Sequence, residues 1–238
     1  MNFTKTMFAL AIGSVGIMGA MSASAAVVNT GDVLSINAGV PAFDGSGTYT
    51  GISSGSYFGM DTNGNGKISG TEKTALSQGT TGLVIGVTTT AGASHPGAPT
   101  AGDTNAITAP WSFFGSTGSD YVTTAVTGST TSGLDMSGWT VTWNGIPAIP
   151  MGAGAWGVGF SEGVGNFVWN GVYGSTYTLD YHGTVPANDP SGFQFVSYAL
   201  HLEGTVTAAP VPEASTYGMM LAGLGLVGFM ASRRRKSI

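Results

Sequence analysis

Short segments in which apolar and polar residues alternate run along most of the chain. In residues 139–143, WTVTW, the side chains of Trp139, Val141 and Trp143 share one face of an extended segment, and the two threonines share the other. Residues 177–181, YTLDY, alternate in the same way. A period of two, with many aromatic and β-branched residues, predicts half-buried strands.

Further strands are expected where β-rich segments are bounded by Gly, Ser, Thr, Asn and Pro. In residues 193–207 the apolar positions change from odd to even numbers, which predicts either a bulge near residues 196–197 or a strand that is buried on both faces at its start. Only residues 71–78 have a helical pattern. Many short strands with Gly-rich turns predict an all-β fold, an antiparallel β-sandwich or jelly roll. The remaining expected strands are residues 32–37, 47–52, 83–90, 112–115, 121–127, 155–160 and 166–173.

The N-terminal segment has the features of a secretory signal peptide. Lys5 is its single basic residue, an apolar run follows over residues 7–21, and small residues stand at positions 23–25. This order predicts a signal peptide over residues 1–25 and an exported domain over residues 26–209.

The C-terminal segment, residues 210–238, has an uncharged apolar span followed by a basic cluster at residues 233–236. At about 1.5 Å of rise per residue, a helix of roughly 20 residues crosses the hydrocarbon layer of about 30 Å. Basic residues remain on the cytoplasmic side. We therefore expect a transmembrane segment over residues 215–232, with the β-domain outside.

Charge is scarce and strongly asymmetric. Only 8% of the residues are charged, and the only lysines or arginines between residues 26 and 209 are Lys67 and Lys73, against eleven acidic residues, a net charge of −9. An acidic domain repels phosphate, so nucleic acid is not an expected partner. The chain has no cysteine, which excludes disulfides, thiol catalysis and thiolate metal sites.

Residues 61–72, DTNGNGKISGTE, have the twelve-residue spacing of an EF-hand calcium loop, with Gly66 at the sharp turn. The expected Ca²⁺ ligands are Asp61, Asn63, Asn65, the backbone carbonyl of Lys67, Ser69 and Glu72. The alternative is a polar Asn-Gly turn between strands. The preceding residues form a poor helix, so we expect a lone EF-hand-like loop in a β-domain. With two charged ligands, a dissociation constant of about 10⁻⁴ to 10⁻³ M is expected.

The C-terminal tail resembles the PEP-CTERM sorting signal of exported bacterial proteins, also labelled an ice-binding-protein C-terminal domain. The residues that carry the resemblance are Pro212, Glu213, Arg233, Arg234, Arg235 and Lys236, with Ala214 where the motif has its second proline. The resemblance implies an exosortase-type sorting protease as a partner, contact with the inner membrane during sorting, and a final place at the cell surface or in an extracellular matrix of exopolysaccharide, as in biofilm.

No sequence motif of a hydrolase or of a phosphate-binding loop is present. We therefore expect a non-enzymatic, structural or adhesive protein, with extracellular polysaccharide as a candidate partner. The alternative is a calcium-supported carbohydrate-binding module with some of the five tryptophans as a stacking platform. An exposed Trp/Tyr cluster would favour binding, and buried aromatic residues would favour a structural role. Asp180 and His182 share one strand face and are expected to face solvent.

Overall fold

The structure is a computed structural model that describes residues 25–77, 82–89, 111–113, 116–209 and 214–234. The expected signal peptide, apart from residue 25, lies outside the described residues. The predicted sorting residues Pro212, Glu213 and Arg235 also lie outside them.

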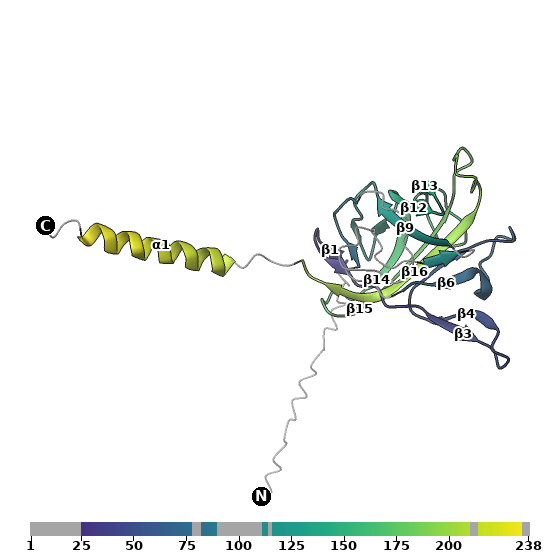
Figure 1. The fold of residues 1–238 in the computed structure, drawn as a ribbon, viewed down its shortest axis with the longest axis horizontal. Coiled ribbons are helices and arrows are strands. Elements are labelled where there is room, and N and C mark those ends of the chain that lie inside the picture. The colour runs from purple at the N-terminus through teal and green to yellow at the C-terminus, as the bar shows by residue number, and fades with distance from the viewer. Residues whose placement is uncertain (1–24, 78–81, 90–110, 114–115, 210–213, 235–238) are drawn as a thin grey trace, which may run out of the picture.

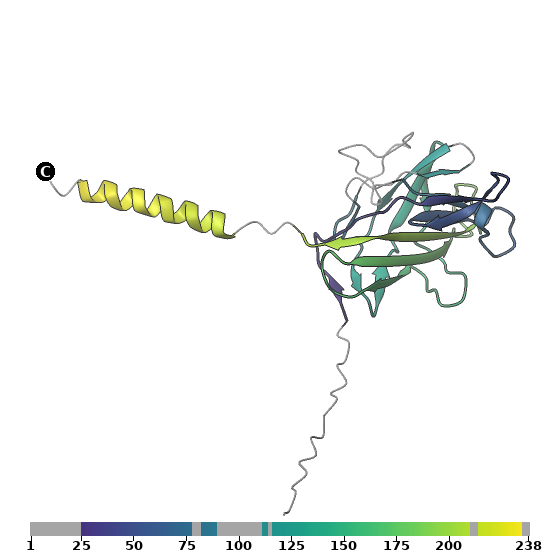
Figure 2. The same cartoon turned by 90° about the horizontal axis from the view of Figure 1, so that it is seen from below.

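The described domain is antiparallel β-structure in packed layers, which confirms the predicted fold class (Figures 1 and 2). A long sheet has the strand order β1-β10-β11-β14-β15-β16-β2-β7, with β5 and β6 attached beside β16. A four-stranded sheet has the order β13-β12-β9-β8, and β3 and β4 form a separate hairpin. The strands of the long sheet are β1 (Val27–Val28), β2 (Val33–Leu34), β5 (Tyr57–Met60), β6 (Lys73–Ala75), β7 (Leu83–Val84), β10 (Gly128–Ser129), β11 (Gly133–Asp135), β14 (Val164–Trp169), β15 (Thr176–Thr184) and β16 (Ser197–Thr207). The other strands are β3 (Val40–Phe43), β4 (Tyr49–Ser54), β8 (Trp111–Phe113), β9 (Ser116–Val122), β12 (Trp139–Trp143) and β13 (Ile146–Pro150).

Strand β16 organises the long sheet. One edge of β16 pairs with β15 along the whole length of β15, from Thr176↔Thr205 to Thr184↔Ser197. The other edge pairs with β5 at its beginning and with β2 at its end. Strand β16 therefore joins the end of the long sheet that contains β5 to the end that contains β2.

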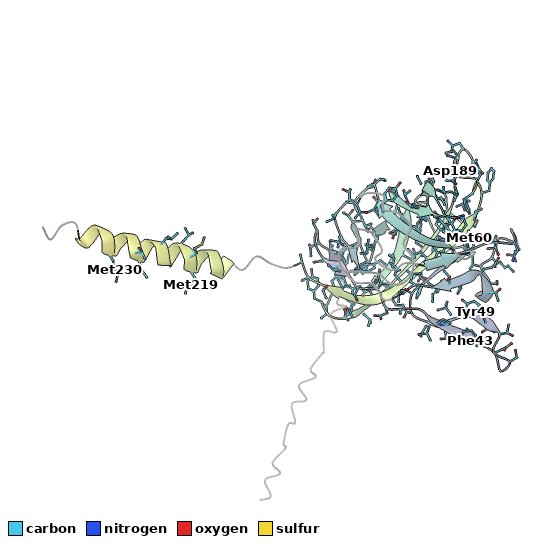
Figure 3. The ribbon with its side chains drawn as sticks, in the orientation of Figure 1. Phe43, Tyr49, Met60, Asp189, Met219 and Met230 are labelled. Carbon is cyan, nitrogen blue, oxygen red and sulfur yellow. The ribbon has the colours of Figure 1, made fainter. Side chains whose placement is uncertain are left out.

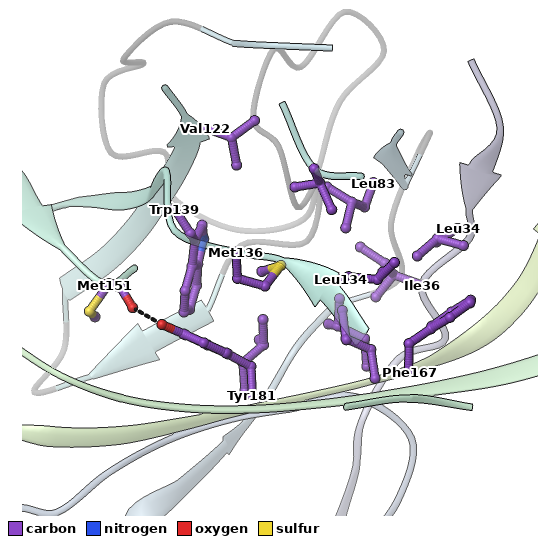
Figure 4. Close-up of a cluster of buried hydrophobic side chains, with 14 of the residues drawn as sticks. Leu34, Ile36, Leu83, Val122, Leu134, Met136, Trp139, Met151, Phe167 and Tyr181 are labelled. Atoms are coloured by element: carbon purple, nitrogen blue, oxygen red, sulfur yellow. Dashed lines mark hydrogen bonds between the residues drawn. The ribbon is translucent and has the colours of Figure 1, made fainter. Parts of the chain in front are cut away.

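The hydrophobic core lies between the long sheet and the four-stranded sheet. Trp139 of β12 is 1% exposed, and its ring lies 6.0 Å from that of Tyr181 and 5.9 Å from that of Tyr198. Its indole Nε1 donates a hydrogen bond to the buried carboxylate of Asp120 at 2.9 Å. The Tyr181 hydroxyl donates to the carbonyl of Met151 at 2.8 Å (Figure 4). In β15 the buried and half-buried positions alternate, as predicted from the sequence. In β12 the predicted inner face is buried, but Thr140 and Thr142 are buried as well, so this strand is not half-buried.

The predicted helix over residues 71–78 is wrong. A short 3₁₀ turn, η1 (Gly70–Glu72), is followed at once by strand β6. The register pair Tyr57↔Ala75 joins β6 to β5. Tertiary strand pairing therefore overrides the weak local preference for helix.

The predicted strand over residues 155–160 is also wrong, because Gly154, Gly157 and Gly159 adopt positive φ angles and the segment is a loop. The change of phase near residue 196 is not a bulge within a strand. Phe195 has a φ of 65°, and β16 begins only at Ser197. Tyr198, Ala199 and Leu200 are all buried, which confirms the alternative, a strand buried on both faces at its start.

Helix α1 (Ala214–Arg234) contains the apolar tail and lies apart from the β-domain in both views (Figures 1 and 2). In the described part of the chain, we find no helix with both the length and the apolar character needed to cross a membrane. The predicted transmembrane segment, residues 215–232, is therefore not confirmed. Four glycines interrupt its apolar side chains and contribute little hydrophobicity.

Both chain ends of the β-domain lie at the same end of the sheet, near β1 (Figure 1). Asp32 ties them together: its Oδ2 accepts hydrogen bonds from the backbone of Asn29 at 2.8 Å and from the hydroxyl of Tyr173 at 2.9 Å. Its Oδ1 accepts from the backbone N–H of Ala209 at 3.1 Å. The segment that leads to α1 therefore leaves from a fixed point. At the opposite end, Phe43 and Tyr49 lie on the β3–β4 hairpin and Asp189 on the loop after β15 (Figure 3).

Candidate functional site

The loop of residues 61–72 curls around the carboxylate of Asp61. Its Oδ1 accepts hydrogen bonds from the backbone N–H groups of Gly64 at 2.8 Å and Asn65 at 3.2 Å, and its Oδ2 accepts from that of Gly66 at 2.7 Å. The positive φ of Gly66, 75°, allows the sharp turn that brings this amide inward. The sequence prediction of a tight turn at Gly66 is confirmed.

The side chain of each of the two asparagines accepts a hydrogen bond from the backbone amide two residues further along the chain. The side-chain oxygen of Asn63 accepts from the backbone of Asn65 at 3.1 Å, and that of Asn65 accepts from the backbone of Lys67 at 2.8 Å. Each of these amide oxygens therefore receives a single protein donor and has a second lone pair available. The loop presents side-chain oxygens at alternate positions, as its spacing predicted.

Glu72 closes the loop and is 5% exposed. Its Oε1 accepts hydrogen bonds from the backbone N–H and the hydroxyl of Thr62 and from the side-chain amide of Asn63, each at 2.9 Å. Its Oε2 accepts from the backbone N–H and the hydroxyl of Ser69, both at 2.9 Å. The backbone amide of Ser69 is the largest cause that lowers the pKa of Glu72; burial opposes it, and the other donors bring the pKa to about 2. Glu72 is therefore an anion held by protein donors.

The residues of this loop fit a hard cation only in part. The side chains of Asp61, Asn63 and Asn65 keep acceptor capacity, whereas both oxygens of Glu72 are saturated by protein donors. Within the described ranges, no three or more His, Cys, Asp or Glu side chains are grouped to hold a metal. To be coordinated by Glu72, a cation at this loop would have to replace the hydrogen bonds that the Glu72 carboxylate now accepts from Thr62, Asn63 and Ser69.

One wall of a surface cleft is made by the same loop. The cleft has a volume of about 330 Å³ and is lined by Tyr57, Gly66, Lys67, Ile68, Lys73, Trp156, His182 and Ala199. The ammonium of Lys73 lies 4.1 Å from the centre of the Tyr57 ring, a cation–π contact. The loop, β5, β6, β15 and β16 therefore meet at one hollow on the outer face of the long sheet.

His182 is held between two rings at this cleft. Its imidazole stacks on Trp156 at 4.4 Å and on Phe160 at 3.6 Å between ring centres. Burial lowers the pKa of His182, and the charge of Lys73 acts in the same direction. The expectation that His182 faces solvent is therefore wrong: the half-buried ring is part of a stack.

His201 lies beside this cleft and forms two hydrogen bonds to acids. Its Nδ1 lies 2.6 Å from Oδ1 of Asp180 and its Nε2 lies 3.0 Å from Oε1 of Glu203, while its ring stacks on Tyr57 at 5.1 Å. Burial lowers the pKa of His201, but the hydrogen bonds and charges of Asp180 and Glu203 outweigh it, so the pKa is raised. Asp180 is therefore paired with His201 across the strands rather than acting with His182.

The four tryptophans whose side chains the structure describes do not form a shared platform. Trp139 and Trp169 are buried and Trp143 is partly buried against the core, whereas Trp156 lines the cleft. The sequence interpretation missed this cleft because its residues come from six separate segments. The signal that could have indicated it is the position of the domain's only two lysines, six residues apart beside the predicted calcium loop.

The β-domain with its apolar helical tail has the organisation of an exported protein with a C-terminal sorting signal. Residues 210–236 match the PEP-CTERM protein-sorting motif. Arg233 and Arg234 stand at the end of α1, where the motif has its basic residues. No similar curated protein was found, and no similar solved structure was found. The match indicates export, transient anchoring at the membrane and processing by exosortase.

Proposed function

We propose that the chain is a non-enzymatic, structural or adhesive protein of the cell surface or the exopolysaccharide matrix, delivered by an exosortase-type sorting protease. The observation that carries this proposal is the match of residues 210–236 to the sorting motif. Support for a structural role comes from the core, in which seven large aromatic side chains of the β-domain are buried. A domain with such a core is suited to a structural role after the sorting protease has delivered it.

The sorting part is tested by expressing the full chain in two matched strains, with and without exosortase. We expect mass spectrometry to show loss of the C-terminal segment only in the strain that has the enzyme, and cell fractionation to place the shortened chain outside. Replacing the basic end, Arg233→Gln with Arg234→Gln and Arg235→Gln, should abolish processing. A chain that stays unprocessed, or that is processed equally in both strains, contradicts the proposal.

We also propose that residues 61–72 bind Ca²⁺ with structural effect. Asp61, Asn63 and Asn65 already present oxygens at alternate positions, and Glu72 would exchange its protein donors for the cation. Extracellular calcium modules have dissociation constants of about 10⁻⁴ to 10⁻³ M. At calcium ten times above the dissociation constant, RT ln 11 gives about 1.4 kcal/mol of stabilisation.

The calcium proposal is tested by thermal unfolding of the full chain in chelator and in millimolar calcium. We expect a rise in Tm of about 3–6 °C, at about 2–4 °C per kcal/mol for a chain of this size. Asp61→Asn and Glu72→Gln should each abolish the rise. The matched control is Asp44→Asn, because Asp44 also holds a turn, accepting from the backbone of Ser46 at 2.8 Å and of Thr48 at 2.9 Å.

In Asp44→Asn the calcium-dependent rise should persist on a lower baseline. Two results would exclude calcium binding by this loop: a native chain without any rise, or a rise that survives both loop substitutions.

A further inference from the structure

The cleft on the outer face gathers the basic side chains of an acidic domain. Lys67, Lys73 and His182 line it, and His201 lies beside it against Tyr57. These four are all the basic side chains among residues 25–209 that the structure describes; the remaining one, His95, lies outside the described residues. In a domain with two lysines and eleven acids, the presence of both lysines makes the cleft a local site of positive charge.

The positive charge at the cleft is not neutralised by nearby acids. The carboxylates of Asp180 and Glu203 point at His201, at 2.6 Å and 3.0 Å. In the loop that forms one wall, the carboxylates of Asp61 and Glu72 accept hydrogen bonds from the loop's own donors. No ion pair is present at Lys67 or Lys73 in the part of the chain that the structure describes. Both ammonium groups therefore remain available to an anion from solution.

The cleft also has rigid aromatic walls. The indole Nε1 of Trp156 donates to the carbonyl of Tyr198 at 2.7 Å, and its ring stacks on His182. The Tyr57 ring is held between His201 and the ammonium of Lys73. Rings fixed in this way lose little conformational entropy when they bind a ligand. The ring of Trp156, which lines the cleft, suits the apolar C–H face of a pyranose, while the lysines suit a negative substituent on it.

We propose that this cleft binds an acidic saccharide, with a pyranose ring against Trp156 and a sugar carboxylate at Lys67 and Lys73. A volume of about 330 Å³ is at the small end of ligand sites, which suits one or two sugar rings. The inference deepens the proposed function, on which it rests for the extracellular location, by naming the matrix partner: a polymer that contains uronate residues. The strongly acidic remainder of the domain repels such a polymer, so binding is confined to this one site.

The test is isothermal titration calorimetry of the full chain, purified in mild detergent, with uronate oligosaccharides: tetragalacturonate and oligomers of mannuronate, guluronate and glucuronate. The matched probe for each is its carboxyl-reduced form, which keeps the rings and removes the charge. We expect at least one uronate series to bind and its reduced form to bind about tenfold more weakly, the typical effect of losing a charge-assisted hydrogen bond.

The matched variants are Lys67→Gln and Lys73→Gln, each expected to weaken binding about tenfold. Lys67→Gln leaves its backbone carbonyl, the predicted calcium ligand, in place. The control is Asn170→Asp, which changes the net charge by the same amount in a turn remote from the cleft and keeps the oxygen that accepts from Val172. It should leave the affinity unchanged.

Trp156→Ala is expected to abolish binding, and its Tm shows whether the fold survives the loss of the bond to Tyr198. The inference is overturned if no uronate series binds, if the reduced form binds equally well, if both lysine variants keep full affinity, or if single-stranded DNA binds in preference to uronates. A chain that is sorted but binds no uronate contradicts this inference alone. A chain that binds uronates but is never processed contradicts only the proposed function.

Discussion

The two faces of strand β15 are built on the same backbone but have different tasks. On the inner face, Tyr177, Leu179 and Tyr181 are buried in the core. On the outer face, Asp180 and His182 are half-buried and engage partners from β16 and from the loop after β13. The difference shows that an outer face with polar residues is not simply a solvated one: here its side chains are as specifically arranged as those of the core.

Side chains on the inner face contribute more to the free energy of unfolding than those on the outer face. The largest expected effect is therefore that of a substitution in the core that the inner face contacts. Trp139→Ala removes the ring that packs against Tyr181 and Tyr198, and it leaves the carboxylate of Asp120 without its indole donor. We expect the free energy of unfolding to fall by about 3–5 kcal/mol, as for other buried large side chains. Urea denaturation followed by circular dichroism measures this loss. A loss below about 1 kcal/mol would contradict the assigned core.

The second effect concerns the buried carboxylate of Glu72, in the loop that forms one wall of the outer-face cleft. Glu72→Gln, studied in chelator, removes the anion that accepts five hydrogen bonds, and we expect a loss of about 1–3 kcal/mol at neutral pH. Because the folded pKa of Glu72 is lowered to about 2, its contribution is fully present above the unfolded pKa and is lost as pH falls toward 2.

The native chain and Glu72→Gln should therefore converge in Tm as the solution is acidified. A constant difference between their Tm values over the same range would contradict a lowered pKa at Glu72.

The third effect is a pH dependence of the outer face. The raised pKa of His201 means that the folded state holds its proton more tightly, so the stabilisation is present below the unfolded pKa and is lost as pH rises through the folded pKa. His201→Gln should remove this loss. With Asp180 and Glu203 partly exposed, we expect at most about 1 kcal/mol.

The measurement for His201 is Tm from about pH 6 to about pH 8, the range in which histidine titrates. His182 acts in the opposite direction, because its lowered pKa makes stability rise with pH. The His201→Gln curve should therefore rise more steeply with pH than the native one. Parallel curves would show that His201 gains nothing from its two acids.

The smallest expected effect is at an outer position without a specific partner. Val168 of β14 is 66% exposed, and Val168→Ala should change the free energy of unfolding by no more than about 0.5 kcal/mol. Measured in the same urea experiments as Trp139→Ala, it provides the reference for the outer face. A loss comparable to that of Trp139→Ala would mean that another surface covers this strand in solution.

Much of the fold could be predicted from local pattern. The alternation of Trp139, Val141 and Trp143 gives β12 with its correct inner face, because one apolar face against one core produces a period of two. The segment of residues 155–160 failed because glycines at alternate positions look like strand spacing but adopt positive φ angles. The segment of residues 71–78 failed because its strand exists only through pairing with β5.

The sites divide in the same way. The turn around Asp61 is local, so its spacing could predict the inward oxygens and the turn at Gly66. The cleft is tertiary: Tyr57, Trp156 and His182 come together only after β5 and β15 have joined β16. No single short segment of the sequence contains these residues, so the cleft could not be predicted from local pattern. The position of the domain's only two lysines was the one available signal.

Strand β16 also determines how the domain carries tension. Ala199, at the floor of the cleft, and Thr207, near the exit to the tail, are about 26 Å apart along the strand at roughly 3.3 Å per residue. A pull between a polymer held at the cleft and the C-terminal tail therefore runs along β16, perpendicular to its hydrogen bonds with β15, β5 and β2. Hydrogen bonds loaded in shear share the force and must break together. Hydrogen bonds between strands that are pulled apart from one end break one after another. A force along β16 therefore meets more resistance than a force that separates the strand from its neighbours one hydrogen bond at a time.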